Sequence, residues 1–193
     1  MTTSASATET FTTSISTIST QSGSLGGLLV QLELNSSRIA SGAAVGISVS
    51  DYNPSPMVLN ISKGASWAVN GLATGGCPSL YYPFGIAIFQ GRYTSANVSQ
   101  AVPLEIFPLV ACPMLVLYIT GYLFQPMSDN ATVLPGTEEA PMSTGISVSG
   151  TYNMTASQLN KSTLFTPGTY TVVAGDEWGN LVFAYFTVVA APS

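Results

Sequence analysis

LFTPGTYTVVAGDEWGNLVFAYFTVV, residues 164–189, has the composition of two β-strands joined by a short turn. Thr169–Ala174 and Leu181–Val189 are rich in the β-branched and aromatic residues that suit a pleated, half-buried surface. Residues 175–180, between them, carry the Gly, Asp and Asn typical of a tight turn. The pattern predicts a β-hairpin. Because a lone hairpin is only marginally stable in water, it needs neighbouring strands and a second layer over its apolar face.

Alternation of apolar and polar residues recurs along the rest of the chain, with Gly and Pro between the alternating segments. The further strands expected are 28–34, 43–50, 57–61, 84–91, 114–120, 122–124 and 145–149. In the first of these, the expected inner face is formed by Leu28, Val30, Leu32 and Leu34. Residues 125–143 are expected to form a long exposed loop, and residues 152–162 a short helix or an irregular connection. Short strands separated by regular turns predict an all-β sandwich.

The chain divides by composition into an N-terminal extension, residues 1–24, and one β-sandwich domain, residues 25–193. The extension is rich in Ser and Thr, which is typical of a flexible or O-glycosylated stalk. A second interpretation is a donor strand that pairs with the sheet edge of a neighbouring molecule. In that case the subunit contacts are made by one period-two face: Phe11, Thr13, Ile15 and Thr17. Ile18 breaks this alternation, and both interpretations stay open.

Charged residues make up only 7% of the chain, and its surface is expected to be polar but largely neutral. The four Lys and Arg residues are scattered and the net charge is −5, which argues against binding nucleic acid. Because the chain has no His and few ionisable groups, little of it titrates between neutral and acidic pH. A hot or acidic exterior would suit such a chain, and a neutral exterior stays open as the alternative.

The residues that usually carry catalysis are largely missing. With no His, the commonest general base, cupredoxin-type copper ligation and most zinc sites are excluded. No Gly-rich phosphate loop or G-x-S-x-G motif occurs. The adjacent carboxylates Glu138-Glu139 and Asp176-Glu177 are expected to be solvated turn residues, since neighbours on a strand point to opposite faces. We therefore expect a protein that is not an enzyme and uses no cofactor or metal.

The apolar run of residues 104–124 is long enough to span a bilayer. Pro108, Pro113 and Gly121 interrupt it, Glu105 lies within it, and no Lys or Arg flanks it. We expect a buried central strand here, not a membrane span.

Two features indicate export from the cell. Cys77 and Cys112 fit one disulfide, which would stabilise the fold by about 4 kcal/mol in the chain-entropy model, although two buried thiols are the alternative. Six N-x-[ST] sequons predict N-linked glycans. Their acceptors are Asn35, Asn60, Asn97, Asn130, Asn153 and Asn160. The expected location is the cell surface or the extracellular space.

Several segments carry a resemblance to a known group: Leu28–Ser50, Asn53-Pro54, Pro167–Tyr170, Trp178–Asn180 and Tyr185–Val188. Together they resemble the secreted immunoglobulin-like β-sandwiches of thermoacidophilic archaea. In the layout of residues 9–189 and in sequon density, the chain is similar to subunits of archaeal surface threads. The resemblance implies an antiparallel immunoglobulin-like sandwich, several N-glycans, and an N-terminal strand placed in the next subunit.

The function expected from these features is a structural subunit of an extracellular filament, a homopolymer assembled by strand addition. One alternative is a surface-anchored binding or S-layer-associated domain on a glycosylated stalk. A further alternative is a capsid or turret protein of an archaeal virus.

Overall fold

The computed structural model describes residues 16–19, 27–64, 67–69, 72, 83–104, 119–135, 147–149, 151–155 and 165–190. Over these residues the chain is all-β, with one 3-10 turn, η2 (Val98–Gln100). The strands are β1 (Ser16–Ser19), β2 (Leu29–Leu34), β3 (Arg38–Ala40), β4 (Gly46–Tyr52), β5 (Leu59–Ser62), β6 (Phe84–Gln90), β7 (Ile119–Phe124), β8 (Asn130–Pro135), β9 (Ser147–Ser149), β10 (Thr151–Thr155), β11 (Gly168–Asp176) and β12 (Leu181–Val189).

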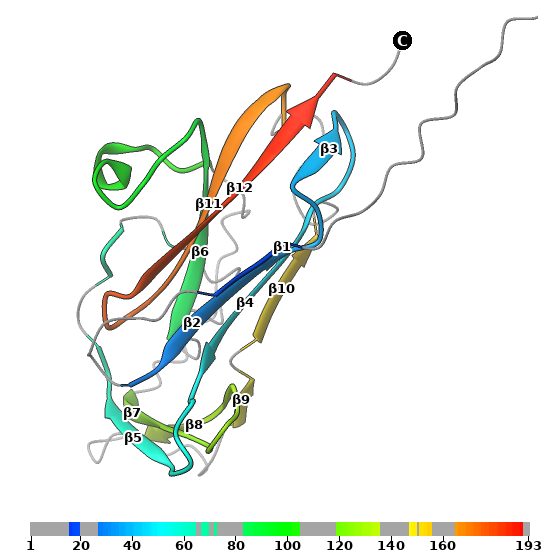
Figure 1. Cartoon of the computed structure of the whole chain (residues 1–193). Helices are drawn as coiled ribbons and strands as arrows, with labels where there is room; N and C mark the ends of the chain where they lie inside the picture. The colour runs from blue at the N-terminus through cyan, green and yellow to red at the C-terminus, as the bar shows by residue number, and fades with distance from the viewer. Residues whose placement is uncertain are drawn as a thin grey trace, which may run out of the picture.

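These strands form three four-stranded sheets. Sheet A has the order β1-β2-β4-β10, sheet B the order β3-β12-β11-β6, and sheet C the order β5-β7-β8-β9. Sheets A and B lie face to face as a sandwich, and sheet C lies at the lower end of the molecule in Figure 1. The all-β sandwich predicted from the sequence is confirmed.

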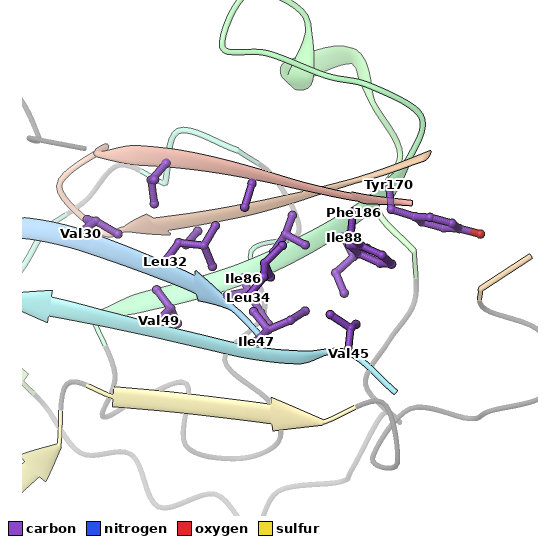
Figure 2. Close-up of a cluster of buried hydrophobic side chains, with 14 of the residues drawn as sticks. Val30, Leu32, Leu34, Val45, Ile47, Val49, Ile86, Ile88, Tyr170 and Phe186 are labelled. Carbon is purple, nitrogen blue, oxygen red and sulfur yellow. The ribbon is translucent and has the colours of Figure 1, made fainter. Parts of the chain in front are cut away.

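The main core fills the space between sheets A and B (Figure 2). On β2 the burial alternates as the sequence pattern predicts, with Val30, Leu32 and Leu34 buried. The β2–β4 register places Leu32 opposite Val49 and Leu34 opposite Ile47, so the two strands present one apolar face. The facing residues of sheet B include Ile86, Ile88, Val172, Ala174, Val182, Ala184 and Phe186.

The hairpin predicted at 169–189 is confirmed as β11 and β12, which pair from Gly168↔Val188 to Gly175↔Leu181. The strand β11 also pairs with β6 on its other side, so it lies in the centre of sheet B. Its residues 170–176 are buried on both faces, because a second apolar cluster covers the face that points away from sheet A. That cluster contains Val69, Ala87, Phe89, Val98 and Val173.

The strand order corresponds to that of an immunoglobulin-like domain. The orders β2-β4-β10 and β12-β11-β6 match strands A-B-E of one immunoglobulin sheet and G-F-C of the other. One pair departs from the purely antiparallel sandwich that was expected: β3 runs parallel to β12, with Ile39 opposite Val188. This happens because the chain leaves sheet A after β2 and reaches sheet B at β3 before it returns as β4.

Tyr170 adds a second immunoglobulin-like feature. It lies near the start of β11, the strand that corresponds to F, and its hydroxyl donates a hydrogen bond to the Thr166 carbonyl at 2.8 Å. This is the arrangement called a tyrosine corner in such domains. The ring of Tyr170 stacks on Phe186 with 5.1 Å between centroids. The PGTY segment of the sequence therefore marks the corner where the chain enters the closing hairpin.

Two strands, β8 in sheet C and β10 in sheet A, overturn sequence predictions. Residues 130–135, expected to lie in a loop, form β8, which pairs with β7. Residues 151–155, where an irregular connection or short helix was expected to begin, form β10, which pairs with β4. Both segments are short, and their strand state depends on partners distant in the sequence, which local propensity does not encode. The rest of each predicted segment lies outside the described residues.

No helix in the described part of the chain is long and apolar enough to cross a membrane. Of the apolar run 104–124, the last residues form β7, which lies between β5 and β8 and buries Tyr122 and Phe124. Residues 105–118 are outside the described ranges.

Candidate functional site

The first candidate site is the edge of sheet A, where a segment of the N-terminal extension is bound. Residues 16–19 form β1, which pairs antiparallel with β2 so that Thr17 is opposite Glu33 and Ile18 is opposite the buried Leu32. This part of the extension is therefore a strand, and it pairs within its own chain. Phe11, Thr13 and Ile15 lie outside the described residues, so the contact predicted for them with another subunit stays a prediction.

The strand β1 covers an edge that carries part of the core. Val30, Leu32 and Leu34 on β2 are all at most 1% exposed, and β1 lies between this strand and solvent on the edge side of the sheet. In Figure 1 β1 lies along β2 at the edge of sheet A. An uncovered edge at β2 would present a row of unpaired backbone groups to any other strand.

The predicted glycan acceptors are exposed wherever the structure describes their side chains. Asn35, Asn60, Asn97 and Asn130 are all exposed. The side-chain oxygens of Asn35 and Asn97 accept hydrogen bonds from the backbone N–H groups of Gly46 and Thr94, each at 2.7 Å. In these two residues the amide nitrogen, to which a glycan is attached, is not used by those bonds. Asn153 lies in β10, and Asn160 is outside the described residues.

The predicted disulfide cannot be placed on the fold. Cys77 and Cys112 both lie outside the described residues.

The second candidate site is a buried acidic cluster formed by Asp51, Asp176 and Glu177. The sequence prediction that Asp176 and Glu177 are solvated turn residues is wrong, since they are 0% and 4% exposed. Asp51, at the end of β4, is also 0% exposed. The charges of Asp176 and Glu177 both act on Asp51.

The turn after β11 is buried because it packs against sheet C. The Trp178 ring meets the rings of Tyr122 and Phe124 edge-on, with centroids 5.7 and 6.2 Å away. Its indole N–H donates to the Ser62 carbonyl at 2.9 Å, at the end of β5. The turn therefore joins sheet B to sheet C, and Glu177 is enclosed at the junction.

Close backbone approach fixes Glu177 in this junction. One of its carboxylate oxygens accepts a hydrogen bond from the Gly64 N–H at 2.8 Å. A Cβ at position 64 would overlap the Glu177 backbone carbonyl, so only glycine fits beside it. On its other side, Glu177 accepts a hydrogen bond from the Tyr122 hydroxyl.

Asp51 and Asp176 each end an inward-facing row of apolar side chains. On β4 the buried row is Ile47, Val49 and Asp51, and on β11 it is Val172, Ala174 and Asp176. The two carboxyls thus reach the same end of the core from opposite sheets.

The two aspartates differ in their hydrogen bonds. Asp176 accepts from the backbone N–H groups of Trp178 and Asn180 at 3.0 and 2.9 Å, and from the Asn180 side-chain amide at 2.6 Å. Among the described residues, neither carboxyl oxygen of Asp51 has a hydrogen-bond partner. An unpaired carboxylate in the interior is strongly unfavourable, so Asp51 is the member of the cluster that most needs neutralisation.

Burial shifts every ionisable group of the cluster in the same direction. It raises the pKa of Asp51 well above its usual value, and the charges of Asp176 and Glu177 add to the effect. Burial also raises the pKa of Asp176, against the opposing effect of its hydrogen bonds. The pKa of Glu177 is raised to about 7, mainly by burial, while the Gly64 N–H and the Lys63 charge oppose the shift. The cluster therefore holds protons at pH values where free carboxyls are ionised.

A signal for Asp51 was present in the sequence. The strand predicted at 43–50 stops one residue before Asp51, yet Asp51 continues the period-two phase of Val45, Ile47 and Val49. Asp176 likewise continues the phase of Val172 and Ala174. A carboxyl in phase with a buried row is the pattern that would have identified the cluster.

Among the described residues, no group of three His, Cys, Asp or Glu side chains is placed to hold a metal ion. Compared with protein-family models, curated proteins and solved structures, the chain has no match in any of the three. Because the β-sandwich hosts many unrelated functions, the function has to be argued from the two sites themselves.

Proposed function

We propose that this chain is a structural subunit of an extracellular filament, in which the N-terminal strand of one copy completes sheet A of the next. The observation that supports this most directly is the pairing of β1 with the edge of β2. In the described part of the chain that pairing spans four residues of β1, and residues 20–28 connect β1 to β2. The same backbone pairs can form between two copies, as in domain swapping.

Exchange of β1 would produce an open polymer when the donor of each copy inserts into a different neighbour. The donor and the acceptor edge are different surfaces of one molecule, so the contact is head-to-tail and does not have to close into a ring. Pairing within one chain has the advantage of a high effective concentration, because β1 and β2 belong to the same molecule. Polymer growth is therefore expected at high local protein concentration, as at a cell surface.

The exposed sequon residues support the extracellular part of the proposal. Asn35, Asn60, Asn97 and Asn130 lie where an enzyme that attaches glycans could reach them. Glycans would also cover a surface that has few charges to keep it soluble.

A glycosylated surface domain that stays monomeric is the second candidate. It is favoured by the same pairing of β1 with β2, because that pairing already closes the edge within one chain. The two candidates differ only in whether β1 is exchanged between copies.

Cross-linking at one residue pair separates these candidates. Thr17 and Glu33 are directly opposite in the β1–β2 register, so cysteines at the two positions can form a disulfide when the strands are paired. One chain carries Thr17→Cys and the other Glu33→Cys, and they are mixed at high concentration under mild oxidation. A filament subunit is expected to give a covalent heterodimer. A mixture of Thr17→Cys with Asn97→Cys, which is exposed and outside this register, is the control.

The double variant Thr17→Cys/Glu33→Cys reports pairing within one chain. If it forms the disulfide only internally, and the mixed single variants give no heterodimer at any concentration, the filament proposal fails and the monomeric surface domain is supported.

A further inference from the structure

We propose that Asp51, Asp176 and Glu177 form a proton-binding site that stabilises the junction of the three sheets in an acidic medium. Each carboxyl comes from a different part of the fold: Asp51 from β4 in sheet A, Asp176 from the end of β11 in sheet B, and Glu177 from the turn that packs on sheet C. This inference is independent of the filament proposal, because it concerns the interior of one copy.

The groups that face the cluster do not supply a compensating charge for Asp51. From the end of β11 and the turn that follows it, Asp51 is faced by Asp176 and Glu177, both negative when ionised. From sheet C, the Tyr122 hydroxyl contacts Glu177. Lys63, which follows β5, is exposed and acts on Glu177, but it is not among the groups that shift Asp51.

The hydrogen bonds distinguish the carboxyl that takes the proton. Asp176 has three N–H donors and Glu177 has the Gly64 N–H and the Tyr122 hydroxyl, so both tolerate the charged form better than Asp51 does. Asp51 has no donor. A proton on Asp51 removes the uncompensated charge without any further ligand.

A proton fits this site better than a metal ion does. A hard cation such as Ca²⁺ needs six to eight oxygen ligands at about 2.3–2.6 Å. The oxygens of Asp176 already accept three N–H groups, and no three acidic side chains in the described part of the chain are arranged around a metal position. A proton requires no such coordination shell.

The consequence is a fold that is most stable in acid. In the unfolded chain these carboxyls lose their protons near pH 4, whereas in the folded protein they keep them to higher pH. Their stabilising contribution is complete below about pH 4. It is lost as the pH rises through the pKa values that the carboxyls have in the folded protein. For each proton held only by the folded protein, the unfolding equilibrium constant rises about tenfold per pH unit. The cluster thus indicates that the protein works in an acidic environment.

Chemical unfolding of the full chain between pH 4 and pH 8 tests this proposal. The wild type is expected to unfold at progressively lower urea concentration as the pH rises. Asp51→Asn replaces the carboxyl with an amide that is neutral at every pH. In this variant the rise of the unfolding equilibrium constant with pH, which is the slope compared here, is expected to be smaller than in the wild type by about a factor of ten per pH unit. Glu33→Gln removes a carboxylate from the other face of sheet A and is the matched control, expected to keep the wild-type slope. Glu177→Gln provides a second variant if Asp51→Asn does not fold, and it too is expected to reduce the slope.

A wild-type stability that stays level or increases from pH 4 to pH 8 would overturn the proposal. So would equal slopes for the wild type and both cluster variants. A calcium titration at pH 8 tests whether the site binds Ca²⁺ instead of a proton. If millimolar Ca²⁺ restores the wild type to its pH 4 stability, and does not do so in Asp51→Asn, the site binds a cation and the proton proposal is wrong.

Discussion

The Tyr170 hydroxyl donates a hydrogen bond to the carbonyl of Thr166, four residues earlier, and so closes the corner through which the chain enters its central strand. Tyr170→Phe keeps the ring stacked on Phe186 but removes this bond. We expect the free energy of unfolding to fall by about 1 kcal/mol, the usual net worth of such a bond. Urea unfolding monitored by circular dichroism measures the change.

Tyr52→Phe is the matched control for that substitution. The Tyr52 hydroxyl has only a long contact, 3.9 Å, to the Met127 sulfur, so its removal is expected to change stability by less than about 0.5 kcal/mol. If the free energy of unfolding falls equally in Tyr170→Phe and Tyr52→Phe, the hydrogen bond at the Tyr170 corner has no special role.

Trp178 connects the β11–β12 turn to sheet C, and its loss is expected to weaken that connection. Trp178→Phe keeps an aromatic ring beside Tyr122 and Phe124 but removes the indole N–H that donates to Ser62. We expect a loss of about 1 kcal/mol together with faster hydrogen exchange at Lys63, whose N–H donates to Thr120 at the edge of the junction.

The chain's other tryptophan supplies the control. Trp67 is 38% exposed, and Trp67→Phe is expected to leave exchange at Lys63 unchanged. Faster exchange in both variants would contradict a specific role for Trp178.

Lys63 opposes protonation of Glu177, so removing its charge should favour the protonated form. In the wild type the pKa of Glu177 is about 7 despite the Lys63 charge. Lys63→Gln is expected to raise the pKa of Glu177 further, and Glu177 then keeps its proton to higher pH. Titration of the Glu177 side-chain carboxyl carbon by NMR measures the shift.

Arg92→Gln removes a cation that lies over the Tyr185 ring, away from the cluster, and should leave the Glu177 titration in place. A Glu177 titration that moves to lower pH in Lys63→Gln would show that the assumed charge interaction is absent.

Ser99→Ala tests glycan attachment at Asn97 without changing Asn97 itself. It destroys the N-x-[ST] motif but keeps the hydrogen bonds between Asn97 and Thr94. In a host that attaches N-linked glycans, mass spectrometry is expected to show the loss of one glycan. Ser95→Ala, which lies in no sequon, is expected to lose none. If the mass of Ser99→Ala differs from that of the wild type only by the oxygen atom that the substitution removes, Asn97 is excluded as an acceptor.

The closing hairpin and β2 could be predicted from the sequence because their patterns are local. The alternation in β2 and the turn residues after β11 are signals carried by consecutive residues. The structure has strands β2, β11 and β12 at the positions that these signals predict. β8 and β10 could not be predicted in the same way, since each is a strand because of a partner far along the chain. The parallel pairing of β3 with β12 is also a property of the whole topology.

The acidic cluster shows a different limit. Asp51 and Asp176 are in phase with buried rows, which the sequence does reveal, but the rows meet only because sheets A and B face each other. Glu177 is buried because its turn packs against sheet C, an arrangement for which the sequence has no local signal. The sequence can therefore identify two of the three carboxyls, but it does not show that the three belong to one cluster.

Sedimentation of the full chain over a range of concentrations, compared with Ile18→Pro, tests strand exchange most directly. Proline at position 18 removes a backbone N–H and disfavours pairing of β1 with β2 in any copy. The account predicts that the unmodified chain forms progressively longer species of uniform width, visible by negative-stain microscopy, and that Ile18→Pro forms none. A full chain that stays monomeric at every concentration, or an Ile18→Pro variant that forms the same filaments, would contradict it.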